Sequence, residues 1–195
     1  MRSSGLLALV LAAAIAAQPT FADQRKGEMQ AGPMAGFSRI KVDSDRMVPG
    51  SRTSTDGVVL GGSFGYRTSK GVVLELGHTD TIHETVGGSN SELSLAQTYV
   101  AMGYEIDLGS QWYLTPKVGY EKWRLFSEDS RQFFDDDEPS GRAKSLSGDA
   151  PIYQIGVSHD VSSMLALGLT VTSSGQDFGQ STMAAVTVKF GFGGK

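Results

Sequence analysis

Residues 93–126, LSLAQTYVAMGYEIDLGSQWYLTPKVGYEKWRLF, form two runs that flank a short DLGS connection. In each run, apolar side chains occupy every second position, and small or charged side chains occupy the positions between them. A period of two is typical of β-strands, because successive side chains of a strand point to opposite faces. Each run is also long enough to cross a bilayer as a tilted strand, which takes roughly 9 to 11 residues. The pattern therefore predicts a hairpin of two membrane-spanning strands.

Two aromatic residues of the apolar face, Tyr104 and Trp112, lie close to the turn of this hairpin. Membrane barrels carry girdles of aromatic residues where the strands meet the bilayer interfaces. The position of both residues therefore favours a strand hairpin in lipid over one that is half-buried in a soluble protein.

Two residues of the second run depart from the pattern. Pro116 has no backbone N–H to donate to a neighbouring strand, and Trp123 falls on the charged face. We expect a bulge between residues 116 and 123 to accommodate both.

The N-terminus has the organisation of a secretory signal. An arginine at position 2 precedes an unbroken apolar run at residues 5–17, and Thr20-Phe21-Ala22 supplies a small-x-small cleavage site. We expect cleavage after Ala22, which divides the chain into a signal peptide at residues 1–22 and a single domain at residues 23–195. No later apolar run approaches the roughly 18 residues that a membrane helix requires, so we expect the mature protein to cross a membrane with strands.

Six further alternating segments flank the central hairpin. They lie at residues 34–42, 57–67, 72–79, 151–161, 164–172 and 182–192. Long polar connections are expected at residues 43–56, 80–92, 127–150 and 173–181, and short turns near residues 68–70, 107–110 and 160–163. Strands that cross a bilayer one after another show this alternation when short turns lie on the periplasmic side and long loops lie outside. The sequence therefore predicts an all-β protein, an eight-stranded antiparallel up-and-down transmembrane β-barrel.

Charged residues within these strands fall mainly on the face opposite the one assigned to lipid. This assignment places Lys41 inside, together with a predicted interior charge network of Arg39, Arg67, Glu75, Glu105, Lys117, Glu121 and Lys189. An eight-stranded barrel has an interior just wide enough for side chains, and an unpaired buried ion is very costly. We therefore predict that Glu105, Lys117 and Glu121 form one buried ionic network with at least one of Arg39, Arg67 or Lys189. Interior charges of this kind would fill the lumen and disfavour an open pore.

Composition restricts the classes of function. After removal of residues 1–22, 16 Lys plus Arg remain (17 without Arg2) against 21 Asp plus Glu, a formal charge of −5. This negative balance argues against a nucleic-acid partner. The chain contains no cysteine, which rules out disulfides, iron–sulfur clusters and thiolate zinc sites. We expect no cofactor and no metal centre.

These features together resemble the OmpA-like eight-stranded outer-membrane barrel domain found in small porin-type and surface proteins. The resemblance rests on the signal peptide, the eight alternating runs, YLTPKVGYEKW at residues 113–123 and the aromatic-rich last strand VTVKFGF at residues 186–192. It implies a protein of the Gram-negative outer membrane, surrounded by outer-membrane lipid and inserted by the barrel assembly machinery through its C-terminal strand. The family's last strand usually ends on a terminal aromatic, whereas Gly193-Gly194-Lys195 follow Phe192 in this chain.

The resemblance and the loop asymmetry predict a non-enzymatic barrel with a structural or adhesin-like role, exercised through extracellular loops. The candidate contact residues are Phe133, Phe134, Asp135, Asp136 and Asp137 in the longest loop. Exposed aromatic residues can mark a contact surface. The acidic tract lacks the regular spacing of a calcium-binding loop, so we interpret it as solvated. The sequence does not identify the extracellular partner.

Two other functions fit parts of the sequence. Some eight-stranded outer-membrane barrels modify lipid A, and His78 with Thr79 and Asp80 near the outer end of a strand is the candidate for such chemistry. No Ser shares a face with His78 at a period of two, and His83 is expected in a loop. Alternatively, a secreted soluble β-barrel that binds a small apolar ligand would place the apolar face inside and the charged face outside.

Overall fold

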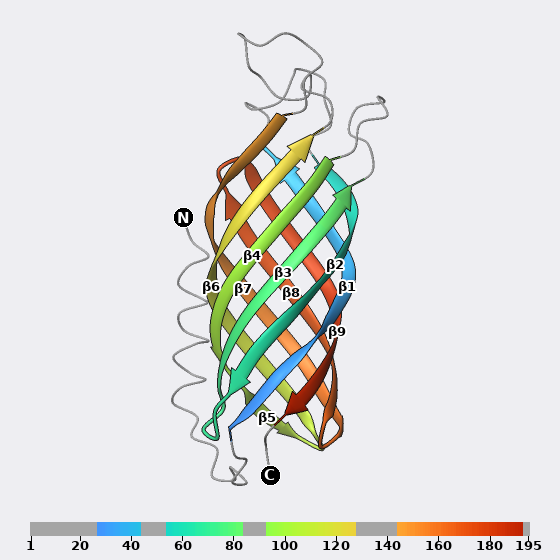
Figure 1. Ribbon diagram of the computed structural model, residues 1–195, viewed down its shortest axis with the longest axis vertical. Coiled ribbons are helices and arrows are strands. Elements are labelled where there is room, and N and C mark those ends of the chain that lie inside the picture. Colours follow the sequence, from blue (N-terminus) through green and yellow to red (C-terminus); the bar gives the residue numbers. More distant parts are fainter. Residues whose placement is uncertain (1–26, 44–53, 84–92, 128–143, 193–195) are drawn as a thin grey trace.

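Nine antiparallel strands account for most of the residues that the structure describes. The computed structural model describes residues 27–43, 54–83, 93–127 and 144–192 (Figure 1). The strands are β1 (Glu28–Val42), β2 (Ser54–Arg67), β3 (Val72–His83), β4 (Leu93–Tyr104), β5 (Ile106–Gly109), β6 (Trp112–Ser127), β7 (Lys144–Ser162), β8 (Leu165–Gln176) and β9 (Gly179–Phe192).

Eight of these strands close into a barrel. Each pairs with its neighbour in the chain, β9 pairs with β1, and β4 pairs directly with β6. The ninth strand, β5, is a four-residue extension that pairs with β6 below the end of β4 (Figure 1). Cross-strand partners followed once around the barrel lead from Met29 back to Arg39 on β1, a stagger of ten residues. This stagger tilts the strands, and closure pairs each of the eight barrel strands with a neighbour on both sides.

The outer surface of the barrel is apolar over most of its height. Large side chains that point outward with about half of their surface exposed include Leu74, Leu76, Val100, Met102, Ile155, Leu167, Leu169 and Val186. A surface of this kind is stable in lipid and unfavourable in water. The alternative of a soluble barrel with its apolar face inside is therefore wrong. No helix in the described residues is long and apolar enough to span a membrane.

The strands extend farther on the extracellular side than the alternation predicts. β2 begins at Ser54, β3 continues to His83 and β7 begins at Lys144, which shortens three of the four predicted loops. The prediction of a long fourth loop at residues 173–181 is wrong, because β8 and β9 continue until only Asp177 and Phe178 separate them. This segment lacks an apolar stripe because it lies beyond the lipid, where its outward side chains meet water.

Beyond the lipid, the polarity of the two faces is reversed. The interior there holds an apolar cluster of Ile40, Val42, Leu93, Leu95, Trp123, Leu125, Ala150 and Phe178. The outward positions at this level carry Arg39, Lys41, Asp56, Asp80, Lys122, Arg124 and Asp149. The predicted interior placement of Arg39 and Lys41 is therefore wrong, because the outer ends of the strands pack like a water-soluble barrel.

The expected bulge between residues 116 and 123 is not present. β6 pairs with β7 in one unbroken register from Trp112 to Ser127. On its other side, β6 changes partner at Pro116, because Lys117 pairs with β4 and Leu114 pairs with β5. The proline thus lies at a break in the pairing, where its missing donor costs little. Trp123 points inward into the apolar cluster.

Candidate functional site

The described interior contains three separate polar groups that include a carboxylate, stacked along the barrel. The lowest surrounds Arg67 of β2, whose guanidinium donates through Nη1 to Glu105 Oε1 at 2.9 Å and through Nη2 to Glu28 Oε2. Glu28 begins β1, and Glu105 lies between β4 and β5. The periplasmic end of the barrel is thereby closed by an arginine that links two carboxylates.

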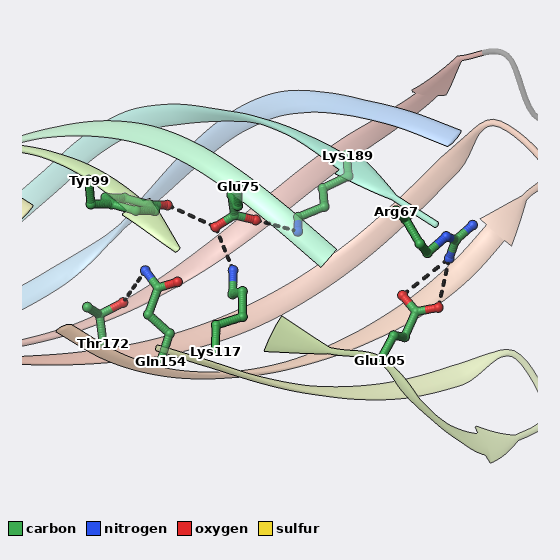
Figure 2. A network of polar contacts seen from close by, with 8 residues as sticks. All are labelled: Arg67, Glu75, Tyr99, Glu105, Lys117, Gln154, Thr172 and Lys189. Atoms are coloured by element: carbon green, nitrogen blue, oxygen red, sulfur yellow. Dashed lines mark hydrogen bonds and ion pairs between the residues drawn. The ribbon is translucent and has the colours of Figure 1, made fainter. Parts of the chain in front are cut away.

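The middle group is centred on Glu75 of β3 (Figure 2). Lys117 Nζ lies 2.5 Å from Glu75 Oε1, and Lys189 Nζ lies 3.0 Å from Oε2. The Tyr99 hydroxyl also donates to Oε1, at 3.0 Å. Tyr99 reaches this carboxylate across its cross-strand partner Gly77, where a Cβ would collide with the phenol ring. One carboxylate thus ties together side chains from four strands.

The upper group surrounds Glu121 of β6. Ser174 and Gln176 of β8 donate to its Oε1 at 2.5 and 2.8 Å, and Gln97 of β4 donates to its Oε2 at 2.9 Å. Within the described residues, no basic side chain lies within 4 Å of this carboxylate. Neutral donors rather than an opposite charge therefore satisfy its oxygens.

The prediction of one continuous ionic network is wrong. Lys117 and Glu121 share a face of β6 but are four residues apart, which is about 13 Å along a strand. Lys117 turns to Glu75 instead, whereas Arg67 binds Glu105 at the lower level (Figure 2). The sequence assigns residues to the inner face, but the stagger of the strands determines which of them lie at the same height.

Arg39, the remaining predicted member, lies on the outer surface. Its Nε and Nη2 donate to the two carboxylate oxygens of Asp56 at 2.6 and 2.9 Å. Both side chains are about two-thirds exposed. Hydrogen bonding to Arg39 holds the pKa of the Asp56 carboxyl below its ordinary value.

Side chains fill the middle of the lumen. A cavity of about 10 Å³ lies beside Glu75, Tyr99 and Lys189, with Gln154 and Thr172 on its wall. This volume corresponds to roughly one water molecule. Above it, the apolar cluster packs across the outer end, where Trp123 and Phe178 meet edge to face with ring centroids 4.9 Å apart. The described interior is thus closed at more than one level.

His83, expected in a loop, is the last residue of β3 and points into the barrel beside the apolar cluster. It is fully buried, and its Nε2 lies 3.3 Å from Ser38 Oγ of β1. This position is outside the membrane-spanning part of the barrel. Burial lowers the pKa of His83 to about 4, so the imidazole is neutral at physiological pH.

His78 lies on the outer surface, with partners that the sequence did not reveal. Its Nδ1 is 2.7 Å from Thr98 Oγ1 of β4, and its Nε2 is 3.3 Å from Asp80 Oδ2. Thr79, which the sequence places in the same candidate group, points inward and is buried. The hydroxyl contributed by Thr98 comes from the neighbouring strand, so only the β3–β4 register could have identified it.

This hydroxyl–imidazole–carboxylate chain is weak as a catalytic site. The side chains of His78 and Asp80 are 54% and 67% exposed, whereas acyl transfer depends on fixed donors in a site that excludes water. Thr98 lies within continuous pairing on both sides, where backbone N–H groups serve the sheet. We therefore interpret the three residues as a polar surface cluster at the boundary of the lipid.

The loop contact candidates Phe133, Phe134, Asp135, Asp136 and Asp137 lie outside the described residues. Among the residues that are described, no group of three His, Asp or Glu side chains is arranged to hold a metal ion.

Comparisons with known proteins agree with the barrel architecture. The family model described as outer membrane protein beta-barrel domain matches residues 7–195. No curated protein matches the sequence.

Several solved structures share the fold. Neisserial surface protein A has a TM-score of 0.61 at 15% identity, covering 84% of this chain and 96% of that chain. Ail, the attachment invasion locus protein of Yersinia pestis, has a TM-score of 0.58 at 13% identity, covering 86% of this chain and 99% of that chain. OprG from Pseudomonas aeruginosa has a TM-score of 0.54 at 10% identity, covering 88% of this chain and 99% of that chain. Ail has also been solved in complex with the heparin analogue sucrose octasulfate. At these identities the similarity establishes the fold alone.

Proposed function

Because this chain belongs to the outer membrane protein beta-barrel family, we propose that it is a non-enzymatic barrel that acts by surface contact through its extracellular loops. Proteins of this family reside in the outer membrane of Gram-negative bacteria, and the apolar outer surface described above fits that location. The barrel anchors the protein, and the connections between strands carry the contact residues.

The observation that supports this proposal best is the closed interior. Buried ion pairs occupy its lower and middle levels, and the apolar cluster occupies its outer end. A lumen filled in this way leaves little space for a solute path, which disfavours transport as the main role. The outer surface and the loops are then the parts of the protein that are available to a partner.

The extended strands support the same proposal. The chain leaves the barrel at Val42, His83 and Ser127, at the ends of strands that continue beyond the lipid. Tight interior packing at this level makes the rim a rigid support. A rigid support lowers the entropy cost of presenting a loop to a partner.

The charge of the longest loop restricts the partner. Ail binds a sulfated heparin analogue, whereas residues Asp135–Asp137 of this chain would repel a polyanion. We expect a partner that is basic or uncharged and that contacts Phe133 and Phe134. The same proposal includes the barrel assembly machinery as a transient partner of β9 during insertion.

A binding assay on whole cells tests the proposal. Cells that display the wild-type barrel are compared with cells that display a variant in which residues 133–137 are replaced by Gly and Ser. We expect adhesion of the cells to a partner surface to fall severalfold in the variant, while the amount of folded barrel stays the same. The matched control replaces five residues within 85–91 in the same way. Unchanged adhesion after replacement of both segments would contradict a contact role for these loops.

The enzymatic alternative has its own test. Lipid A from cells with and without the protein is compared by mass spectrometry, with His78→Ala as the matched variant. The surface-contact proposal predicts identical lipid A in all three strains. Loss of an acyl chain only in cells with wild-type protein would favour catalysis instead.

A further inference from the structure

The outward face of β6 changes from apolar to basic within one step. Its outward positions from Trp112 to Tyr120 are apolar or aromatic, and the next two outward positions are Lys122 and Arg124. Tyr120 is 55% exposed, and tyrosine rings prefer the level of the lipid headgroups. The two cations therefore lie at the extracellular boundary of the lipid, where the headgroups of the outer leaflet are located.

Neither cation forms an ion pair with another described residue. Arg39 at a similar level is held by Asp56 through two hydrogen bonds. By contrast, no carboxylate of the described residues lies within 4 Å of Lys122 or Arg124. Asp149 is the cross-strand partner of Lys122, yet the two side chains do not form an ion pair. Two adjacent positive charges are thus left for a ligand.

The neighbours of these residues leave room for a ligand. Thr98 and Ala96 of β4 lie opposite Lys122 and Arg124, and Ser147 of β7 lies opposite Arg124 on the other side. All three side chains are small. The two basic residues are two positions apart on one face of a strand, about 6.6 Å, so their long side chains can converge on one group.

We propose that Lys122 and Arg124 bind the phosphate of an anionic lipid in the outer leaflet, with its acyl chains lying along Val118 and Tyr120. A guanidinium presents paired donors that match phosphate oxygens, and an ammonium adds a mobile point charge. Headgroup and acyl chains are recognised together, because the basic pair lies directly above the apolar surface of the same strand. A free phosphate ion would lack this second contact.

Native mass spectrometry of the folded barrel in zwitterionic detergent micelles measures this binding. Phosphatidic acid is the probe, and phosphatidylcholine is the neutral comparison. We expect Lys122→Gln and Arg124→Gln each to lower the first association constant for phosphatidic acid about fivefold, since one basic residue near a lipid surface contributes roughly that factor. Binding of phosphatidylcholine should stay within twofold of wild type in both variants.

Two further variants separate the proposed site from the overall charge. Asp149→Asn removes the negative charge beside Lys122 and should raise the affinity for phosphatidic acid severalfold. Both cations are retained in this variant, so it tests the site independently of Lys122→Gln and Arg124→Gln. Lys41→Gln removes an exposed cation on β1 and should change the affinity less than twofold.

Three results would overturn the proposal. An equal loss in Lys41→Gln would mean that the net charge attracts the lipid without a site. Equal affinities for phosphatidic acid and phosphatidylcholine would mean that the phosphate is not recognised by its charge. Inorganic phosphate that competes with the lipid at equimolar concentration would show that the acyl chains contribute nothing.

Discussion

Trp123 of β6 and Phe178 of the β8–β9 turn pack edge to face inside the outer end of the barrel, with ring centroids 4.9 Å apart. The two residues are 55 positions apart in the sequence (178 − 123), and the closed barrel brings them together. Phe178 is 1% exposed, although it occupies a two-residue turn in a segment rich in Ser, Gly and Gln. The turn thus contributes an anchor to the apolar cluster that closes the barrel above the lipid.

Replacement of Phe178 by alanine should lower the free energy of unfolding by about 3 to 5 kcal/mol, the usual cost of truncating a buried phenylalanine. Urea unfolding in lipid vesicles, followed by tryptophan fluorescence, measures the loss. Phe126→Ala is the matched control, because Phe126 points outward at the same end of the barrel and is 39% exposed. A loss in the control as large as that in Phe178→Ala would mean that the cluster is not what stabilises this end.

Glu75 and Lys117 should behave as one unit, whereas Lys117 and Glu121 should not. Removal of one partner of a buried ion pair typically costs about 3 to 5 kcal/mol, because the other charge remains buried without a partner. We expect the losses of Lys117→Met and Glu75→Gln to be strongly non-additive in the double variant. The losses of Lys117→Met and Glu121→Gln should add within about 0.5 kcal/mol, because the two side chains belong to separate groups. Urea unfolding in vesicles gives the free energies of unfolding for both double-mutant cycles. Strong coupling between Lys117 and Glu121 would contradict their assignment to separate groups.

His83 should make the stability of the barrel depend on pH. Burial lowers its pKa in the folded state to about 4, below the ordinary value of 6.5. The unfolded chain therefore binds more protons between these values, and stability should fall as the pH is lowered from about 6.5 to about 4, by at most roughly 1.4 kcal/mol per pH unit. Above pH 6.5 this contribution is constant. His83→Gln should flatten the curve in this window, and an unchanged slope would assign the pH dependence to other groups.

The aromatic residues at the end of β9 should matter for insertion more than for the folded state. Phe190 and Phe192 point outward, each about half exposed, on the strand through which we expect the assembly machinery to recognise the chain. Phe192→Ala should lower the amount of folded barrel in the outer membrane severalfold. The readout is the faster migration of folded barrel on a denaturing gel before boiling. Phe64→Ala, an equal truncation on the outward face of β2, should have a much smaller effect.

The strand pattern could be derived from the sequence because every spanning strand places one face against lipid. Leu167 and Leu169 of β8 alternate with small inward residues, and the structure orients them toward lipid as predicted. The same rule misassigned Arg39, because the rule holds only where lipid is the solvent. Beyond the lipid, water surrounds the barrel, and Ile40 and Val42 turn inward for the reason that apolar residues of a soluble protein do.

The sequence by itself determined the class of the fold, the lipid face of the spanning strands and the inward direction of Glu75, Lys117 and Glu121, because these follow from a period of two. Only the tertiary structure decided which inward residues meet, and that Thr98 lies beside His78. Contacts between strands depend on register and on the stagger of the closed barrel, and a change of one residue in register would exchange the two faces of a strand. No local pattern in the chain encodes that stagger, so the grouping of Glu75 with Lys117 and Lys189 emerges only when the barrel closes.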